Sequence, residues 1–93
     1  MSRTLLISYD LGGPETSDSY KKLIDKIKAL GTWAKPLESF WFVKTSDTVP
    51  SVRDALKSAM DSNDKLLVLD VTGVNWSSLN VSSDVTTWMK NNL

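Results

Sequence analysis

Phe40-Trp41-Phe42-Val43 is the stretch of sequence on which the predicted fold depends. Its aromatic and β-branched residues are typical of a buried strand. Because successive side chains of a strand point to opposite faces, this stretch presents large apolar groups on both sides. A strand with no polar side needs cover on both faces of its sheet. The sequence therefore predicts a layered domain built around these four residues.

The chain before this stretch predicts one strand and one helix. Residues 4–9 form a short apolar run that ends in a turn over residues 10–14. Thr16 or Ser17 can cap the helix that follows, and Gly31 stands where a C-terminal glycine is favoured. Between them, apolar residues recur at helical spacing: Tyr20, Leu23, Ile24, Ile27 and Leu30.

The rest of the chain predicts three more strands and a second helix. Residues 33–45 are expected to be an interrupted strand pair, because Pro36 cannot donate to a ladder and marks an edge or a bulge. Pro50 suits a first helical turn, and the apolar stripe of that helix contains Val49, Val52, Leu56, Ala59 and Met60. Residues 65–72 form another apolar strand, which ends at Gly73.

The predicted order is β-α-β-β-α-β, which is the ferredoxin-like split βαβ arrangement of the α+β class. Right-handed crossovers place the four antiparallel strands in the order 4-1-3-2, with both helices on one face. We expect a ferredoxin-like domain over residues 1–73 and a C-terminal extension over residues 74–93. The extension should contain a strand or loop and then a short helix capped by Ser82 or Ser83. It is expected to pack on the same domain or on a dimer mate.

Composition excludes several classes of function. With 93 residues, the chain is long enough for one domain. Eleven basic and eleven acidic residues give a net charge of zero, which weakens the case for a bulk electrostatic grip on nucleic acid. Without cysteine or histidine, the chain has no thiol nucleophile, no catalytic triad and no imidazole zinc site. It also has no apolar run long enough to span a membrane and no secretion signal, so we expect a cytoplasmic protein without a membrane partner.

Three segments of the chain resemble one known family. They are residues 5–11 (LLISYDL), 37–45 (LESFWFVKT) and 64–68 (DKLLV). They are similar to the SinR-like family of small phage and bacterial proteins, which in turn resembles the small CRISPR-associated adaptation subunit and the virulence-associated protein VapD. The resemblance covers about residues 4–73, and residues 37–45 are its most specific part. It implies the ferredoxin-like fold and a homodimer.

The resemblance also implies a candidate site at the end of the first strand. Asp10 occupies the position of the relatives' strand-end aspartate, which meets its dimer mate and can hold a divalent metal. In the predicted sheet this end adjoins the start of strands three and four, so Glu38, Ser39 and Lys65 are expected near Asp10. Carboxylates doubled by symmetry could bind Mg²⁺ or Mn²⁺ and activate water at a phosphate. In the alternative, Asp10 caps the following turn and Glu38 pairs with a surface lysine.

Two further groups of residues have a functional and a structural interpretation. Lys21, Lys22, Lys26 and Lys28 could follow a phosphate backbone, but Asp18 and Asp25 interrupt them at helical distances, which favours an ordinary solvated face. Trp33 and Trp41 could form a base-stacking platform. The structural alternative places them under the sheet or at a dimer interface.

Three functions remain open on these grounds. The first is a non-catalytic homodimeric binding or scaffold protein resembling the adaptation subunit, in prokaryotic or phage nucleic-acid biology. The second is a metal-dependent endonuclease that uses Asp10 at the dimer interface. The third is a phage counter-defence protein that binds a host partner protein or sequesters a nucleotide. We expect no cofactor for the first, whereas the second needs Mg²⁺ or Mn²⁺. A single candidate carboxylate without a general base predicts no efficient cleavage of nucleic acid.

The two apolar sides of the aromatic strand predict an obligate homodimer. Burying a Trp or Phe is worth about 1.5–3 kcal/mol relative to leaving it exposed, and sheet-to-sheet pairing about a two-fold axis would bury several at once. The centre of that interface is expected to hold either Tyr9, Trp41 and Val43 or their opposite-face neighbours Phe40 and Phe42. Residues 74–81 are expected to extend the fourth strand across to the mate.

Overall fold

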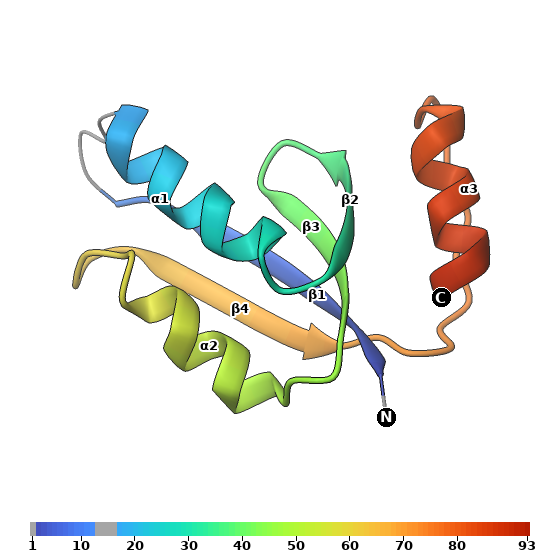
Figure 1. Cartoon of the computed structure of the whole chain (residues 1–93). Helices are drawn as coiled ribbons and strands as arrows, with labels where there is room; N and C mark the ends of the chain where they lie inside the picture. The colour runs from blue at the N-terminus through green and yellow to red at the C-terminus, as the bar shows by residue number, and fades with distance from the viewer. Residues whose placement is uncertain (1, 13–16) are drawn as a thin grey trace.

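The computed structural model describes residues 2–12 and 17–93, and these form four strands and three helices. Along the chain they are β1 (Arg3–Asp10), α1 (Ser17–Lys28), β2 (Thr32–Leu37), β3 (Phe40–Thr45), α2 (Val49–Lys57), β4 (Lys65–Asp70) and α3 (Ser83–Asn92) (Figure 1). The predicted small α+β domain with a four-stranded antiparallel sheet is therefore confirmed. The predicted turn residues Gly13 and Pro14 and the predicted cap Thr16 lie outside the described residues.

The sheet has the strand order β2-β3-β1-β4, with every neighbouring pair antiparallel. Counted from the β4 edge, the strands stand in the order 4-1-3-2. β1 runs through the interior of the sheet, where Leu5 pairs with Val43 on one side and with Asp70 on the other. The β2–β3 ladder is irregular between Ala34 and Leu37, which confirms the interruption predicted at Pro36.

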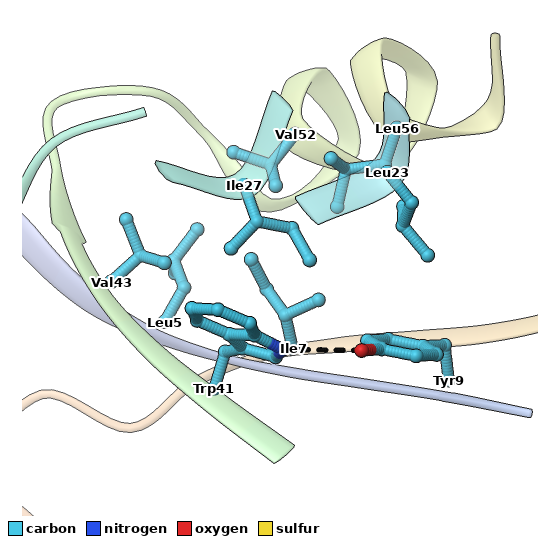
Figure 2. Packing of buried hydrophobic residues seen from close by; sticks show 9 residues of the cluster. All are labelled: Leu5, Ile7, Tyr9, Leu23, Ile27, Trp41, Val43, Val52 and Leu56. Carbon is cyan, nitrogen blue, oxygen red and sulfur yellow. Dashed lines mark hydrogen bonds between the residues drawn. The ribbon is translucent and has the colours of Figure 1, made fainter. Parts of the chain in front are cut away.

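The hydrophobic core lies between the sheet and the two helices α1 and α2 (Figure 2). Alternate residues of β1 and β3 point toward the helices, whose buried side chains come from the predicted apolar stripes. The Trp41 indole Nε1 donates a hydrogen bond to the Tyr9 hydroxyl at 3.3 Å inside this core. The buried set is Leu5, Ile7, Tyr9, Leu23, Ile27, Trp41, Val43, Val52 and Leu56.

One of the two predicted interface sets is wrong. Tyr9, Trp41 and Val43 are 8%, 2% and 0% exposed, because α1 and α2 of the same chain cover them. A second copy cannot reach these side chains without opening the core. Any pairing between copies must therefore use the opposite side of the sheet or one of its edges. We call that opposite side the open face.

Helix α3 covers the β2–β3 part of the open face. The Trp88 ring stacks on Phe42 with centroids 6.3 Å apart and planes 17° apart, and Met89 is buried beside them. The Thr4 hydroxyl donates to the carbonyl oxygen of Asn92, which ties the end of α3 to β1. The short C-terminal helix is confirmed, with Ser82 at its N-cap position but without a side-chain capping bond.

The connection between β4 and α3 is a loop. Residues 74–81 contain no strand within this chain, so the extension of the fourth strand to a mate stays a prediction. Gly73 adopts a positive φ of 75°, which glycine tolerates without steric cost, and the chain then leaves the sheet. Its helix returns over the chain's own sheet, where α3 contacts β2.

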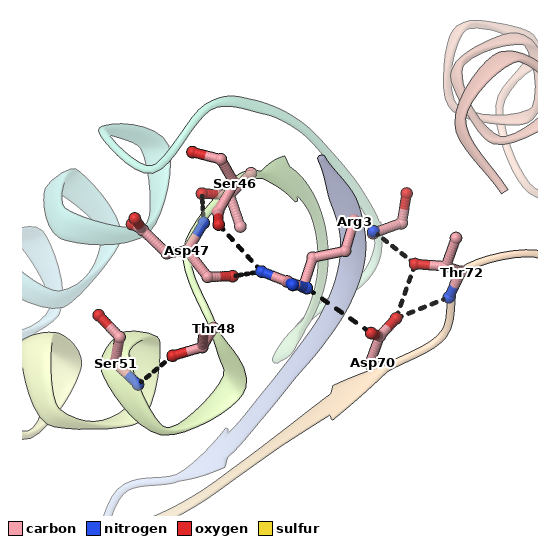
Figure 3. A network of polar contacts seen from close by, with 9 residues as sticks. Arg3, Ser46, Asp47, Thr48, Ser51, Asp70 and Thr72 are labelled. Carbon is pink, nitrogen blue, oxygen red and sulfur yellow. Dashed lines mark hydrogen bonds and ion pairs between the residues drawn. The ribbon is translucent and has the colours of Figure 1, made fainter. Parts of the chain in front are cut away.

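A polar network fixes the end of β4 next to the start of β1 (Figure 3). The Asp70 carboxylate accepts hydrogen bonds from the Thr72 backbone N–H at 3.0 Å and from the Thr72 hydroxyl at 2.6 Å. Arg3 lies 3.8 Å from the same carboxylate and donates to the carbonyl oxygens of Ser46 and Asp47 at 2.9 and 2.8 Å. The network therefore links β1, β4 and the loop before α2.

This network predicts a pH dependence of stability. Hydrogen bonds from the Thr72 side chain and backbone, with a smaller contribution from Arg3, lower the pKa of Asp70 below its ordinary value of 3.8. A carboxyl with a depressed pKa in the folded state stabilises the fold above its unfolded pKa, and this contribution is lost as the pH falls through the folded value. We expect Asp70→Asn to be less stable than the wild type at neutral pH. The difference should shrink as urea titrations are repeated from pH 5 toward more acidic solutions. A difference that stays constant with pH would contradict the assignment to ionised Asp70.

Candidate functional site

The structure brings the four predicted site residues to one end of the sheet. Asp10 at the end of β1 pairs in register with Lys65 at the start of β4. The Tyr9 backbone N–H donates to the carbonyl oxygen of Ser39 at 3.3 Å, which places the β2–β3 turn beside the same strand end. Glu38 is in that turn and is exposed, without a described hydrogen bond or ion pair. A shallow hollow of about 220 Å³ adjoins Asp10 and Lys65.

The charged groups at this strand end are of both signs. Among residues 2–12 and 17–93, no group of three His, Cys, Asp or Glu side chains could hold a metal ion. The direct cross-strand neighbour of Asp10 is an ammonium group, and opposite charges in that position attract each other. An ammonium group beside the carboxylate also repels a divalent cation. The arrangement therefore suits a surface charge pair better than the predicted Mg²⁺ or Mn²⁺ site.

Asp64 has the turn-capping role that the sequence suggested for Asp10. One carboxylate oxygen of Asp64 accepts from the Gly12 backbone N–H at 2.9 Å, and the other accepts from the Asp61 N–H at 2.7 Å. Asp64 thereby connects the turn after β1 to the turn before β4. The signal in the sequence was the run Asp61-Ser62-Asn63-Asp64, whose residue types favour side-chain bonds to nearby backbone groups.

An apolar groove lies between the open face and the segment that leads into α3. Its volume is about 330 Å³, and its walls include Leu37, Phe40, Phe42, Trp76, Leu79 and Met89. Leu79 is 83% exposed at one wall. Leucine at this level of exposure, next to two phenylalanines and an indole, forms an apolar patch of the kind that interaction sites present.

A second apolar area lies on β4, beyond the reach of α3. The register places Leu67 opposite Ser8 and Leu69 opposite Leu6, all on the open face. Leu67 is 58% exposed and Leu69 is 42% exposed. The sequence predicts residues 65–72 as an apolar strand at the edge of the sheet, but the apolar pattern does not tell which of its side chains stay exposed.

The proposed base-stacking platform is only half available. Trp41 is buried in the core, whereas Trp33 is 40% exposed and its ring centroid lies 5.1 Å from that of Trp41. The Lys28 ammonium lies over the Trp33 ring at 4.8 Å from its centroid. The Trp33 indole therefore makes a cation–π contact with Lys28. The interpretation of Trp33 and Trp41 as packing residues accounts for what is seen.

Comparisons with known proteins identify no relative from which a function could be taken. No protein-family model matches this chain, and no solved structure matches it significantly. Within the described ranges, no helix has the length and apolar character needed to cross a membrane.

Proposed function

We propose that this chain is a non-catalytic homodimeric binding or scaffold protein. The order β-α-β-β-α-β with its 4-1-3-2 sheet supports a ferredoxin-like assignment. The sequence resemblance to the SinR-like family and the adaptation subunit favours a place in prokaryotic or phage nucleic-acid biology. The chain would act by holding partners through its surfaces.

The observation that carries this proposal is the apolar surface exposed on the open face and on the segment that leads into α3. Helix α3 covers Phe42, but Leu67, Leu69 and Leu79 remain exposed to water. Full burial of one such leucine is worth about 1.5–3 kcal/mol. Several together are a substantial fraction of the roughly 5–15 kcal/mol that stabilises a typical small domain. Association of two copies is the simplest way to cover them, since a two-fold axis buries the same patch twice.

Light scattering tests the homodimer. At micromolar concentration the particle mass should be about twice the 10.3 kDa chain mass. Dilution should shift the population toward the single-chain mass, because association depends on concentration. A mass that equals one chain at every concentration would contradict the proposal.

A non-catalytic protein and a metal-dependent endonuclease are distinguished by a nuclease assay. Asp10 is exposed and has Lys65 as its cross-strand neighbour, an arrangement that supports neither a bound metal nor a general base. We expect purified protein with Mg²⁺ or Mn²⁺ to leave single- and double-stranded DNA and RNA intact. Asp10→Ala should behave like the wild type in the same assay. Metal-dependent cleavage that is present in the wild type and lost in Asp10→Ala would overturn this expectation.

A further inference from the structure

The outer edge of β4 presents unpaired backbone groups. The Thr4 carbonyl oxygen accepts from the Val71 N–H at 2.8 Å, and the Thr4 N–H donates to the Thr72 hydroxyl at 3.0 Å, so the polar groups of Thr4 face β4. Because these groups alternate along antiparallel strands, Leu67 and Leu69 use theirs toward β1. The N–H and C=O groups of Leu66, Val68 and Asp70 therefore point away from the sheet. The strand order ends at β4, so no described strand pairs with them.

This edge lacks the features that usually prevent strand pairing. Proteins protect free edges with proline, bulges, interior charges or a covering element. The interior of β4 is Leu66-Leu67-Val68-Leu69, and its charges, Lys65 and Asp70, stand only at the two ends. Its ladder with β1 is regular over six pairs. Helix α2 contacts β4, but a hollow of about 200 Å³ remains between Pro50 and Arg53 on the helix and Leu66 and Val68 on the strand.

We infer that the β4 edge pairs antiparallel with the β4 edge of a second copy of this chain, so that two four-stranded sheets become one continuous sheet. This inference rests on the proposed homodimer and names its interface. A second copy suits the edge because β4 is self-complementary. Its unpaired groups recur at every second residue, so two antiparallel copies can satisfy each other's backbone groups. Antiparallel pairing also keeps Lys65 of one copy away from Lys65 of the other, and Asp70 away from Asp70.

The alternation of side chains restricts the register of this pairing. Directly opposite residues of antiparallel strands share a face, so the two-fold axis passes at a residue and not between two residues. Leu67 and Val68 are the two central positions of β4, where the axis gives the longest pairing. An axis at Leu67 would place Asp64 opposite Asp70 of the mate, and like charges in that position are destabilising. We therefore assign the axis to Val68. This register sets Leu67 opposite Leu69 of the second copy on the open face, where the two side chains contact each other across the new strand pair.

Cysteine cross-linking tests the register directly. The chain has no cysteine, so any disulfide comes from the introduced residues. Leu67 and Leu69 of the second copy would form a non-hydrogen-bonded pair with Cα atoms about 4.5 Å apart, which a disulfide spans. A mixture of Leu67→Cys and Leu69→Cys, exchanged and then oxidised, should give a covalent dimer. Each variant alone should give little, because positions 67 and 67 of two copies would be diagonal neighbours about 7–8 Å apart. Efficient cross-linking of Leu67→Cys alone would overturn the assignment.

Amide hydrogen exchange separates edge pairing from other dimers. In the proposed dimer the Leu66 and Val68 amides are protected at high protein concentration, and their exchange accelerates at least tenfold on dilution to the monomer. The double variant Leu67→Lys/Leu69→Lys should have the mass of one chain at a concentration where the wild type is dimeric. The control Leu79→Lys changes a still more exposed leucine, 83% exposed and away from β4, and should remain dimeric.

The possible failures are distinguishable. A wild-type dimer with fast-exchanging Leu66 and Val68 amides would overturn the β4 interface while leaving the proposed homodimer intact. A mixture of Leu79→Cys with Leu67→Cys that cross-links better than the 67–69 mixture would show that the C-terminal segment occupies the edge. That result would also overturn the inference. A wild type that is monomeric by light scattering would overturn both proposals.

Discussion

Trp41→Ala is expected to lower the free energy of unfolding by about 3–5 kcal/mol, the range for large-to-small aromatic substitutions in cores. Trp41 is 2% exposed and packs among residues of β1, β3, α1 and α2. Its removal leaves a cavity that these elements cannot fill without moving. It also removes the donor that meets the Tyr9 hydroxyl. Because a domain of this size has about 5–15 kcal/mol of stability, the loss should be visible as a much lower urea midpoint.

Trp33→Ala is the matched control for this substitution. Trp33 is 40% exposed and contacts Trp41 from the end of the aromatic cluster. Its replacement should cost about 1 kcal/mol, mainly through the lost aromatic pair. Both variants are measured by urea denaturation followed by circular dichroism, since each loses a fluorophore. Equal destabilisation by the two substitutions would show that Trp41 is not buried as described.

Gly31→Ala is expected to destabilise the fold by about 3 kcal/mol, at the upper end for steric overpacking. A Cβ atom at this position would collide with the backbone carbonyl oxygen of Lys44. Because the obstacle is backbone of the sheet, it cannot move aside as a flexible side chain would. The connection from α1 to β2 would have to shift away from β3. Thermal and urea denaturation should both show the loss.

Gly73→Asn provides the control for the glycine prediction. Gly73 has a φ of 75° and open space where a side chain would start. Asparagine adopts this left-handed conformation more readily than most residues, so the variant should stay within about 1 kcal/mol of the wild type. If Gly31→Ala were as mild as Gly73→Asn, the close approach of α1–β2 to Lys44 would be wrong.

The candidate site shows how a local pattern can be right while its chemistry is decided elsewhere. The antiparallel order predicted that Glu38, Ser39 and Lys65 lie near Asp10, and the strand register and the β2–β3 turn place all four at one end of the sheet. The nearest registered partner of Asp10 is Lys65, however, and the turn is capped by Asp64. Which carboxylate meets which donor depends on small displacements of two turns. Residue spacing along the chain does not contain that information.

Local patterns in the sequence were sufficient for the elements and their order. Helical spacing located α1 and α2, Pro36 marked the irregularity within β2, and Gly73 marked where the chain leaves the sheet after β4. These features are local, because side-chain periodicity, the missing proline donor and the freedom of glycine act within a few residues. Handedness of the crossovers then restricts the sheet to few arrangements.

Only the tertiary structure decided which apolar side chains are covered. Trp41 and Leu67 both lie in apolar strands, yet Trp41 is buried beneath two helices while Leu67 is exposed on an edge strand. The C-terminal segment could have crossed to a mate or returned to its own sheet, and α3 returned to stack Trp88 on Phe42. Cover is a property of elements far apart in the chain that meet in space. The hydrophobic effect is non-directional. An apolar pattern therefore predicts that a surface is buried, but it does not predict which element buries it.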